Sequence, residues 1–171
     1  MTTEPRIYVA CLAAYNCGRL HGEWISCEGL DAEDLTAEVE AMLAKSPVPF
    51  AEEHAIHDHE GLEGFDVGEY TALSDVADIV ALIEEHGDVA RAAASLVVND
   101  LDQVRELCTE KYLGAWDSVE EYAEELLDGQ LDLPDGLRCY FAYDRFATDL
   151  ELSGDISTVE DDGVIHIFDN R

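Results

Sequence analysis

The densest group of potential metal ligands lies at residues 54–60, where His54, His57 and His59 stand close to Asp58 and Glu60. Residues two apart on a strand share a face, so His57 and His59 could support a weak metal site. No Glu directly follows His54, as a zinc-protease motif would require. We favour the alternative, a polar strand end with imidazoles facing solvent, and we expect no metal.

Motifs for catalysis are also lacking. The sequence holds no nucleophile elbow, phosphate-binding loop or dinucleotide fingerprint. Carboxylate pairs could hydrolyse a substrate, but pairs arise easily among forty acidic residues. The stretch Glu160-Asp161-Asp162-Gly163 lacks the alternating acids of a calcium loop and predicts a four-residue hairpin loop. Cys11, Cys17 and Cys27 show no ligand spacing and are interpreted as small apolar residues. We expect neither an enzyme nor a cofactor.

Charge is the strongest signal in the 171-residue chain. Forty Asp and Glu face nine Lys and Arg, which gives a formal net charge of −31. Such a surface repels nucleic acids and anionic membranes, so direct binding to either is not expected. The acids are spread over segments with hydrophobic periodicity rather than gathered in blocks, which predicts a folded acidic surface. A basic groove built to hold nucleic acid would attract it.

The spacing of the acids leaves several interpretations open. Acids four residues apart on a helix repel each other, so some other benefit must offset that cost. Duplex DNA carries one charge per ~1.7 Å, and thirty-one charges at that density would span roughly 53 Å. Composition alone favours ordinary solubility or adaptation to high salt over nucleic-acid mimicry, and calcium binding comes last. The main alternative to mimicry is an acidic enzyme or metal-binding protein adapted to high salt.

The N-terminal third is predicted to be a small antiparallel sheet beneath one helix. Strands are expected at residues 7–12, 23–25 and 55–58, with a turn at 16–18. The helix begins after Asp31 as its N-cap and ends before Pro47. The Gly-rich stretch 61–64 is the expected domain boundary.

The middle third is predicted to be helical, without a strand. Ser74 caps a helix that ends at Gly87, a second helix covers residues 88–98, and a third extends from Asn99 and Asp100 to about Tyr112.

The last third is predicted to mix helices with a hairpin. Ser118 and Glu121 form a capping box, Leu133-Pro134-Asp135-Gly136 forms a turn, and residues 137–152 form a helix. Residues 156–159 and 164–168 form the hairpin. The predicted class is therefore α+β, with domains at 1–61, 62–113 and 114–171.

Four segments of the chain resemble segments of a known protein family and follow one another in the same order as they do there. They are Ile7-Tyr8-Val9-Ala10 with Gly22-Glu23-Trp24-Ile25, then Ala55-Ile56-His57-Asp58, then Glu69-Tyr70, and finally Asp149-Leu150-Glu151-Leu152-Ser153-Gly154. Together they resemble the ArdA antirestriction proteins over nearly the whole chain. His59, where an aromatic is more usual, and Thr148, where a basic residue is expected, are departures from the pattern.

The resemblance implies an elongated protein of three small domains that forms a homodimer through its C-terminal part. It implies a DNA mimic that binds type I restriction-modification enzymes, both the methyltransferase core and the full complex, in place of DNA. It also implies carriage on a mobile genetic element that enters a bacterium. No apolar run has the length of a membrane span, and no secretory signal is recognised, so we expect a cytoplasmic protein in the bacterial host.

Two groups of residues follow as candidates. Carboxylates that would stand for phosphates are Glu33, Asp34, Glu38, Glu40, Asp75, Asp78, Glu84, Glu85, Glu120, Glu121, Glu124 and Glu125. Candidates for the dimer interface are Arg138, Tyr140, Phe141, Asp144 and Arg145. Arg138 and Arg145 would reduce repulsion between two acidic chains, and Tyr140 and Phe141 fall off the stripe formed by Tyr143 and Phe146. The alternative is a central helix buried on several sides within one domain.

Overall fold

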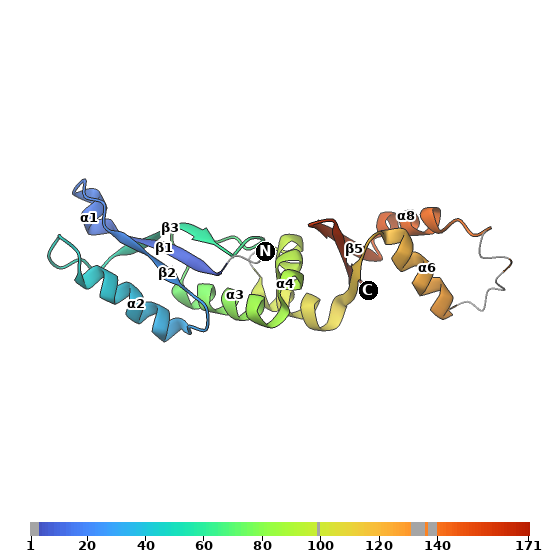
Figure 1. Ribbon diagram of the computed structural model, residues 1–171, viewed down its shortest axis with the longest axis horizontal. Helices are drawn as coiled ribbons and strands as arrows, with labels where there is room; N and C mark the ends of the chain where they lie inside the picture. Colours follow the sequence, from blue (N-terminus) through green and yellow to red (C-terminus); the bar gives the residue numbers. More distant parts are fainter. Residues whose placement is uncertain (1–3, 99, 131–135, 137–139) are drawn as a thin grey trace. The chain divides into compact units, whose positions relative to one another are not determined.

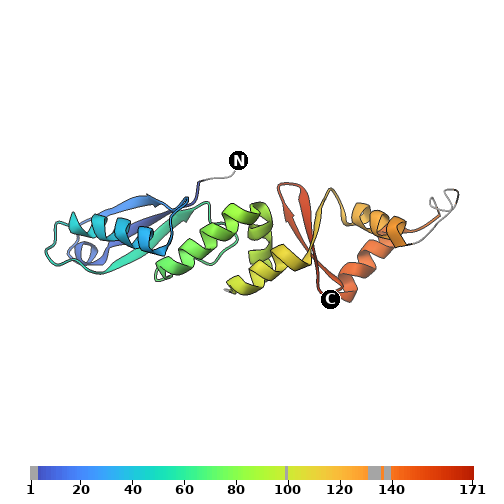
Figure 2. The same ribbon diagram turned by 90° about the horizontal axis from the view of Figure 1, so that it is seen from below.

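The computed structural model describes residues 4–98, 100–130, 136 and 140–171. The chain divides into two compact units, Met1–Ala94 and Ser95–Arg171, each of which combines helices with a three-stranded antiparallel sheet (Figures 1 and 2). The predicted α+β class is therefore confirmed. The division into three domains stays a prediction.

The sheet of the N-terminal unit is covered on one face by a helix. Its strands β1 (Arg6–Cys11), β2 (Gly22–Ser26) and β3 (His54–Glu60) lie in the order β2-β1-β3. Helix α2 (Ala32–Ala44) lies on the sheet as predicted, and it packs against β1 and β2 with an apolar stripe of Leu35, Val39, Met42 and Leu43. The predicted N-cap is confirmed, because Asp31 Oδ1 accepts hydrogen bonds from the backbone N–H of Glu33 and Asp34. A short helix α1 (Leu12–Asn16), which the sequence pattern did not predict, follows β1.

A β-bulge interrupts the pairing of β1 with β3. Val9 lies opposite Ile56 and Tyr8 opposite Asp58, so His57 is an extra residue between the two pairs. His59 then lies opposite Ile7, on the side that α2 covers, whereas His57 and Asp58 are exposed. The expectation that His57 and His59 share a face is therefore wrong, because the bulge breaks the alternation of side chains.

Two further helices complete this unit, α3 (Leu73–His86) and α4 (Asp88–Leu96). The prediction that Ser74 caps α3 is wrong. The helix begins at Leu73, two residues earlier than a Ser74 cap would place it, Ala72 is its N-cap, and the Ser74 hydroxyl instead donates to Asp75 Oδ1 at 3.5 Å. Its predicted end is confirmed at Gly87, where φ is 60°. Helix α3 packs along α2, so both helices lie in one layer of the unit.

Arg91 joins α4 to the loop that follows β3. Its guanidinium donates to the Gly61 carbonyl oxygen at 3.2 Å and pairs with Asp88 at 2.9 Å. Gly64 sits against the same residue, since a Cβ there would lie 2.5 Å from the Arg91 carbonyl oxygen. Gly64 also has a φ of +92°, so only glycine allows this close approach.

The C-terminal unit begins with helix α5 (Leu101–Glu106), capped by Asp100 as predicted, and the π-helical turn η1 (Leu107–Lys111). Strand β4 (Tyr112–Trp116) follows, then α6 (Val119–Gln130), α8 (Tyr143–Ser153), β5 (Ile156–Asp161) and β6 (Val164–Asp169). The sheet order is β4-β6-β5. The sequence analysis predicted no strand in the middle of the chain, and this is wrong at its end. Strand β4 begins at Tyr112 and pairs with the distant β6.

The hairpin between β5 and β6 is tighter than predicted. Glu160 pairs with Ile165 and Asp161 with Val164, so the loop consists of Asp162 and Gly163 rather than four residues. Both have positive φ, 47° and 81°, as a two-residue type I′ turn requires.

The core of this unit lies between α6, α8 and the sheet, and includes Val119, Tyr122, Ala123 and Leu150. Helix α8 begins at Tyr143, six residues later than expected, so Tyr140 and Phe141 precede it. The predicted turn at 133–136 lies outside the described residues except for Gly136.

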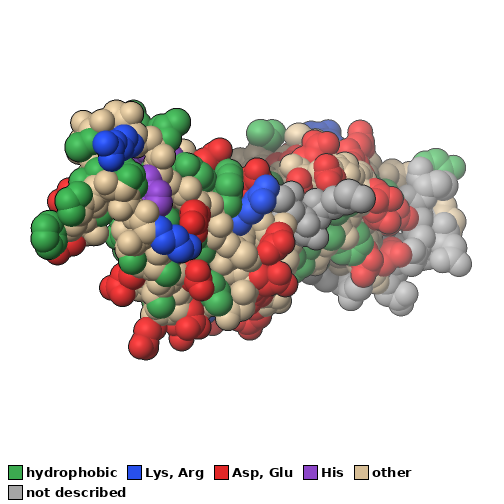
Figure 3. Space-filling model, turned by 60° about the vertical axis from the view of Figure 1, so that its left-hand side comes forward, with side chains coloured by type: hydrophobic (Ala, Val, Ile, Leu, Met, Phe, Trp, Pro, Cys, Tyr) green, Lys and Arg blue, Asp and Glu red, His purple; other side chains and the backbone are tan. Residues whose placement is uncertain are grey.

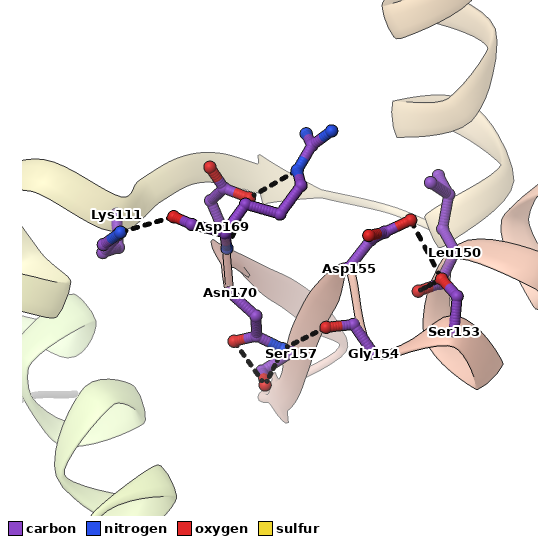
Figure 4. A network of polar contacts seen from close by, with 9 residues as sticks. Lys111, Leu150, Ser153, Gly154, Asp155, Ser157, Asp169 and Asn170 are labelled. Carbon is purple, nitrogen blue, oxygen red and sulfur yellow. Dashed lines mark hydrogen bonds and ion pairs between the residues drawn. The ribbon is translucent and has the colours of Figure 1, made fainter.

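A polar network fastens the last residues to the end of α8 (Figure 4). The Asn170 side chain donates to the Gly154 carbonyl oxygen and to Ser157 Oγ, both at 3.0 Å. Lys111 Nζ donates to the Arg171 carbonyl oxygen at 2.6 Å. These bonds hold β5, β6 and η1 together at one edge of the unit.

Candidate functional site

Four candidate carboxylates lie on the outer face of α2. Glu33, Asp34, Glu38 and Glu40 are all exposed, because Leu35 and the rest of the apolar stripe take the inner face. Asp34 and Glu38 are one turn apart, which separates their Cα atoms by about 6 Å along the axis. The helix therefore presents a row of negative charge to solvent.

Helix α3 adds four more exposed acids, Asp75, Asp78, Glu84 and Glu85. Glu84 also has an internal role that the sequence did not predict, since its Oε1 accepts a hydrogen bond from the Gly29 backbone N–H at 2.8 Å. Because α2 and α3 pack together, their acids belong to one layer of the unit. Figure 3 shows Asp and Glu gathered toward the lower side of this unit, where Figure 1 places both helices.

Helix α6 carries the last four, Glu120, Glu121, Glu124 and Glu125, all exposed opposite its buried stripe. The capping box is confirmed in one half. The Glu121 backbone N–H donates to Ser118 Oγ at 3.1 Å, but the Glu121 carboxylate accepts from the Asp117 N–H rather than from that of Ser118.

Five described cations pair with acids outside the candidate set. Among the described residues, the ion pairs of Lys and Arg join Arg6 to Glu60, Lys45 to Glu23, Arg91 to Asp88 and Glu63, Arg105 to Asp102, and Arg171 to Asp169. Within that part of the chain, no Lys or Arg pairs with any of the twelve candidate carboxylates. In the described ion pairs, the basic group nearest to any of them is the His86 imidazole, whose Nε2 lies 3.8 Å from Glu85 Oε2.

Comparison with known proteins decides the family. Residues 7–165 match the family described as "Antirestriction protein (ArdA)". The chain belongs to the ArdA antirestriction family. No curated protein matches it. The ArdA family consists of inhibitor proteins and is not a known enzyme family.

Two exposed acids of this ArdA chain were missed by the sequence analysis. Glu106 on α5 and Glu110 on η1 are four residues apart, and neither forms an ion pair among the described residues. They have the same spacing that singled out the acids of α2 and α6, so the pattern could have identified them. We use the name acidic surface for the twelve candidate carboxylates, and we add Glu106 and Glu110 to the part of it that lies on the C-terminal unit.

The candidate dimer residues of the ArdA chain are only partly described. Arg138 lies outside the described residues, and Tyr140 is 83% exposed ahead of α8. The Phe141 ring packs on Tyr143, with 4.9 Å between ring centroids. Asp144 and Arg145 are exposed at the start of α8. Because Tyr140 and Phe141 precede the helix, the argument that they mark a second helical face does not hold, and the dimer stays a prediction.

His57 and His59 border a shallow hollow of about 390 Å³ on β3, which His54 does not line. His57 Nε2 lies 3.9 Å from Glu69 Oε1, and burial lowers the pKa of His54. Within the described part of the chain, no three His, Cys, Asp or Glu side chains are grouped so that they could hold a metal ion.

The surroundings of Cys11 and Cys27 indicate structural roles for both thiols. Burial raises the pKa of the Cys27 thiol to about 11, which keeps it protonated and unreactive at neutral pH. Cys11 is buried and its Sγ accepts from the Ala14 N–H, so it caps α1. Cys17 is exposed, so the interpretation of all three cysteines as small apolar residues that fill space does not hold for it. No helix in the described residues has the length and apolar character needed to cross a membrane.

Proposed function

We propose that this ArdA protein is a DNA mimic that occupies the DNA-binding groove of type I restriction-modification enzymes. The observation that carries the proposal is the exposure of twelve helical carboxylates, none of them paired with a described Lys or Arg. A groove lined with Lys and Arg binds phosphates through the same charge and the same hydrogen-bond acceptors that carboxylates offer.

The partners follow from this mechanism. The protein binds the methyltransferase core and, through it, the full restriction complex, and it acts in the bacterial cytoplasm where those enzymes meet DNA. A homodimer would double the length of acidic surface laid along the groove. The residues Tyr140, Phe141, Asp144 and Arg145, with Arg138, are the proposed contacts between the two copies. The net charge of −31 argues against direct binding to nucleic acid.

Competition for the groove tests this function. Purified protein is titrated into a type I methyltransferase core that holds labelled duplex DNA, and the DNA released is measured by fluorescence anisotropy. We expect near-stoichiometric displacement that weakens as salt is raised. Salt ions screen the attraction between exposed charges, and the screening length is about 10 Å at 0.1 M salt. Absence of displacement across several type I enzymes would refute DNA mimicry while leaving the family assignment intact.

A matched pair of variants assigns the effect to the candidate acids. The first combines Glu33→Gln, Asp34→Asn, Glu38→Gln and Glu40→Gln on α2. The control removes four exposed acids outside the candidate set, through Glu52→Gln, Glu53→Gln, Glu160→Gln and Asp161→Asn. We expect the α2 variant to weaken displacement roughly tenfold and to flatten its salt dependence, since each exposed charge contact contributes about 0.2–1 kcal/mol. An equal loss in both variants would show that net charge matters and that position does not.

A further inference from the structure

Two stretches without acids meet at one end of the N-terminal unit. Residues 5–22 and 41–51 contain no Asp or Glu, although the chain has forty acids in 171 residues. The first stretch ends in α1 and the loop before β2, and the second leads from the end of α2 into the loop before β3. Antiparallel pairing brings the end of β1 beside the starts of β2 and β3. We call residues 12–21 and 45–51 at this end the apolar tip.

One hydrogen bond joins the two loops of the apolar tip to each other, and two more tie the first loop to α2 and to the residues just before β3. Arg19 Nη1 donates to the Pro47 carbonyl oxygen at 3.3 Å, and the His21 imidazole bonds the Met42 carbonyl oxygen at 2.9 Å. The Leu12 backbone N–H donates to the Glu53 carbonyl oxygen at 3.0 Å. The tip is thus a defined surface, ordered before any partner binds.

Large apolar side chains point into solvent here. Leu20 is 92% exposed, Phe50 is 95% exposed, and Tyr15 is also exposed. Phe50 has a φ of 60°, a conformation that a bulky residue rarely adopts. Neither the backbone strain nor the exposed ring stabilises the fold, and such strain recurs at functional positions.

Arg19 stands beside these side chains and is exposed. Among the described residues it forms no ion pair, although acids outnumber cations more than fourfold in the chain. In Figure 3, where this end of the unit comes forward, hydrophobic side chains and basic groups are prominent toward the upper left. The tip therefore differs from the acidic helices in both charge and hydropathy.

We propose that the apolar tip is a second contact with the restriction enzyme, separate from the acidic surface. A groove lined with Lys and Arg would not favour a surface that holds Arg19 and no acid, so the tip meets protein surface outside the groove. Charge complementarity indicates a carboxylate on the partner that pairs with Arg19, and the exposed Phe50 and Leu20 call for apolar surface beside it. This inference rests on the proposed function.

The test uses the variant Phe50→Gly/Leu20→Gln, with Val98→Gln as its control because Val98 is another exposed apolar residue, at 86%. Direct binding to the complete type I enzyme and to its methyltransferase core is measured by biolayer interferometry at two salt concentrations. We expect the tip variant to bind at least about tenfold more weakly to the complete enzyme, as loss of buried anchor residues does. Its salt dependence should match that of the native protein, and its melting temperature should be unchanged or higher.

The outcomes separate the two proposals. If the native protein binds and the tip variant binds equally well, the tip is not a contact and the acidic surface alone suffices. If the native protein binds neither the core nor the complete enzyme, the proposed function fails and the tip contact fails with it. If the tip variant changes only the sedimentation of the free protein, the tip meets a second copy of the chain, which would also overturn the proposal. The variant Arg19→Gln should weaken binding without the control showing any change.

Discussion

Individual carboxylates of the acidic surface are each weak contributors. An exposed charge pair contributes about 0.2–1 kcal/mol, so removing one carboxylate such as Glu38 should weaken binding by less than about fivefold. Glu84 and Glu121 differ from the others because they also accept hydrogen bonds from backbone N–H groups of their own unit. Effects of substitution at these two positions therefore mix binding with local stability, and tests of mimicry are cleaner at α2.

The thiol of Cys27 makes the stability of the fold sensitive to alkaline pH. Burial raises its pKa from 9.0 to about 11 in the folded chain, so the unfolded chain loses this proton at lower pH than the folded chain does. The thiol's contribution is fully present below pH 9.0 and is lost as pH rises toward about 11. Within that window, we expect deprotonation of this thiol in the unfolded chain to lower the free energy of unfolding by about 1.4 kcal/mol per pH unit.

Urea denaturation of the native protein and of Cys27→Ala, followed from pH 8 to pH 11, measures this effect. Burial also raises the pKa values of Tyr112 and Tyr122, so both proteins lose stability toward pH 11. The difference between their slopes isolates the thiol. Parallel slopes would show that Cys27 titrates alike in the folded and unfolded chains.

At the scale of elements, α6 shows a conflict between binding and stability. Glu120 and Glu124 repel each other one turn apart, as do Glu121 and Glu125. The variant Glu124→Gln/Glu125→Gln removes both repulsions and keeps the carboxylates of the first turn, which the helix dipole favours. We expect the free energy of unfolding to rise by about 0.4–1 kcal/mol at low salt while displacement of DNA weakens.

The variant Glu120→Gln/Glu121→Gln is the matched control, because it removes the same two repulsions. It also removes the acids of the first turn and the bond from the Asp117 N–H to Glu121, so its gain should be smaller. Thermal unfolding monitored by circular dichroism compares the two. An equal gain in both would mean that helix-end effects are negligible in α6.

Elements with local signals were predicted well from the sequence. The Asp31 cap, the stripe of α2 and the end of α3 at Gly87 depend on neighbouring residues, so the pattern contains them. Strand β4 was missed because its partner β6 lies about fifty residues later and its five residues show no alternation. The β3 bulge was missed because it exists only in the pairing with β1.

For the candidate site, the exposure of the carboxylates was predictable from the sequence, but the ion pairs around them were not. Helical periodicity predicted that the twelve acids would be exposed, and the structure shows that they are. Which acids the few cations pair with was not predictable, since Arg6 meets Glu60 and Lys45 meets Glu23 across strands and loops. The apolar tip likewise arises from loops that only the tertiary fold brings together.

For the whole molecule, salt should act in opposite directions on folding and on binding. Screening reduces the self-repulsion of thirty-one net charges, so the melting temperature should rise modestly between about 10 mM and 300 mM NaCl. The same screening weakens displacement of DNA. Circular dichroism should show a folded protein even at the lower salt, because each unit has a buried apolar core. Unfolding at low salt would instead favour a protein adapted to high salt.

The positions of the central strands have a consequence for synthesis of the protein. Strand β1 is the centre of the first sheet, so that sheet is complete once the ribosome has released residues up to Glu60. The centre of the second sheet is β6, which ends at Asp169, so β4 and β5 have no partner until translation of this strand is finished. The sheet of the N-terminal unit can therefore assemble while the C-terminal unit is still being translated, whereas the sheet of the C-terminal unit cannot assemble before β6 has left the ribosome.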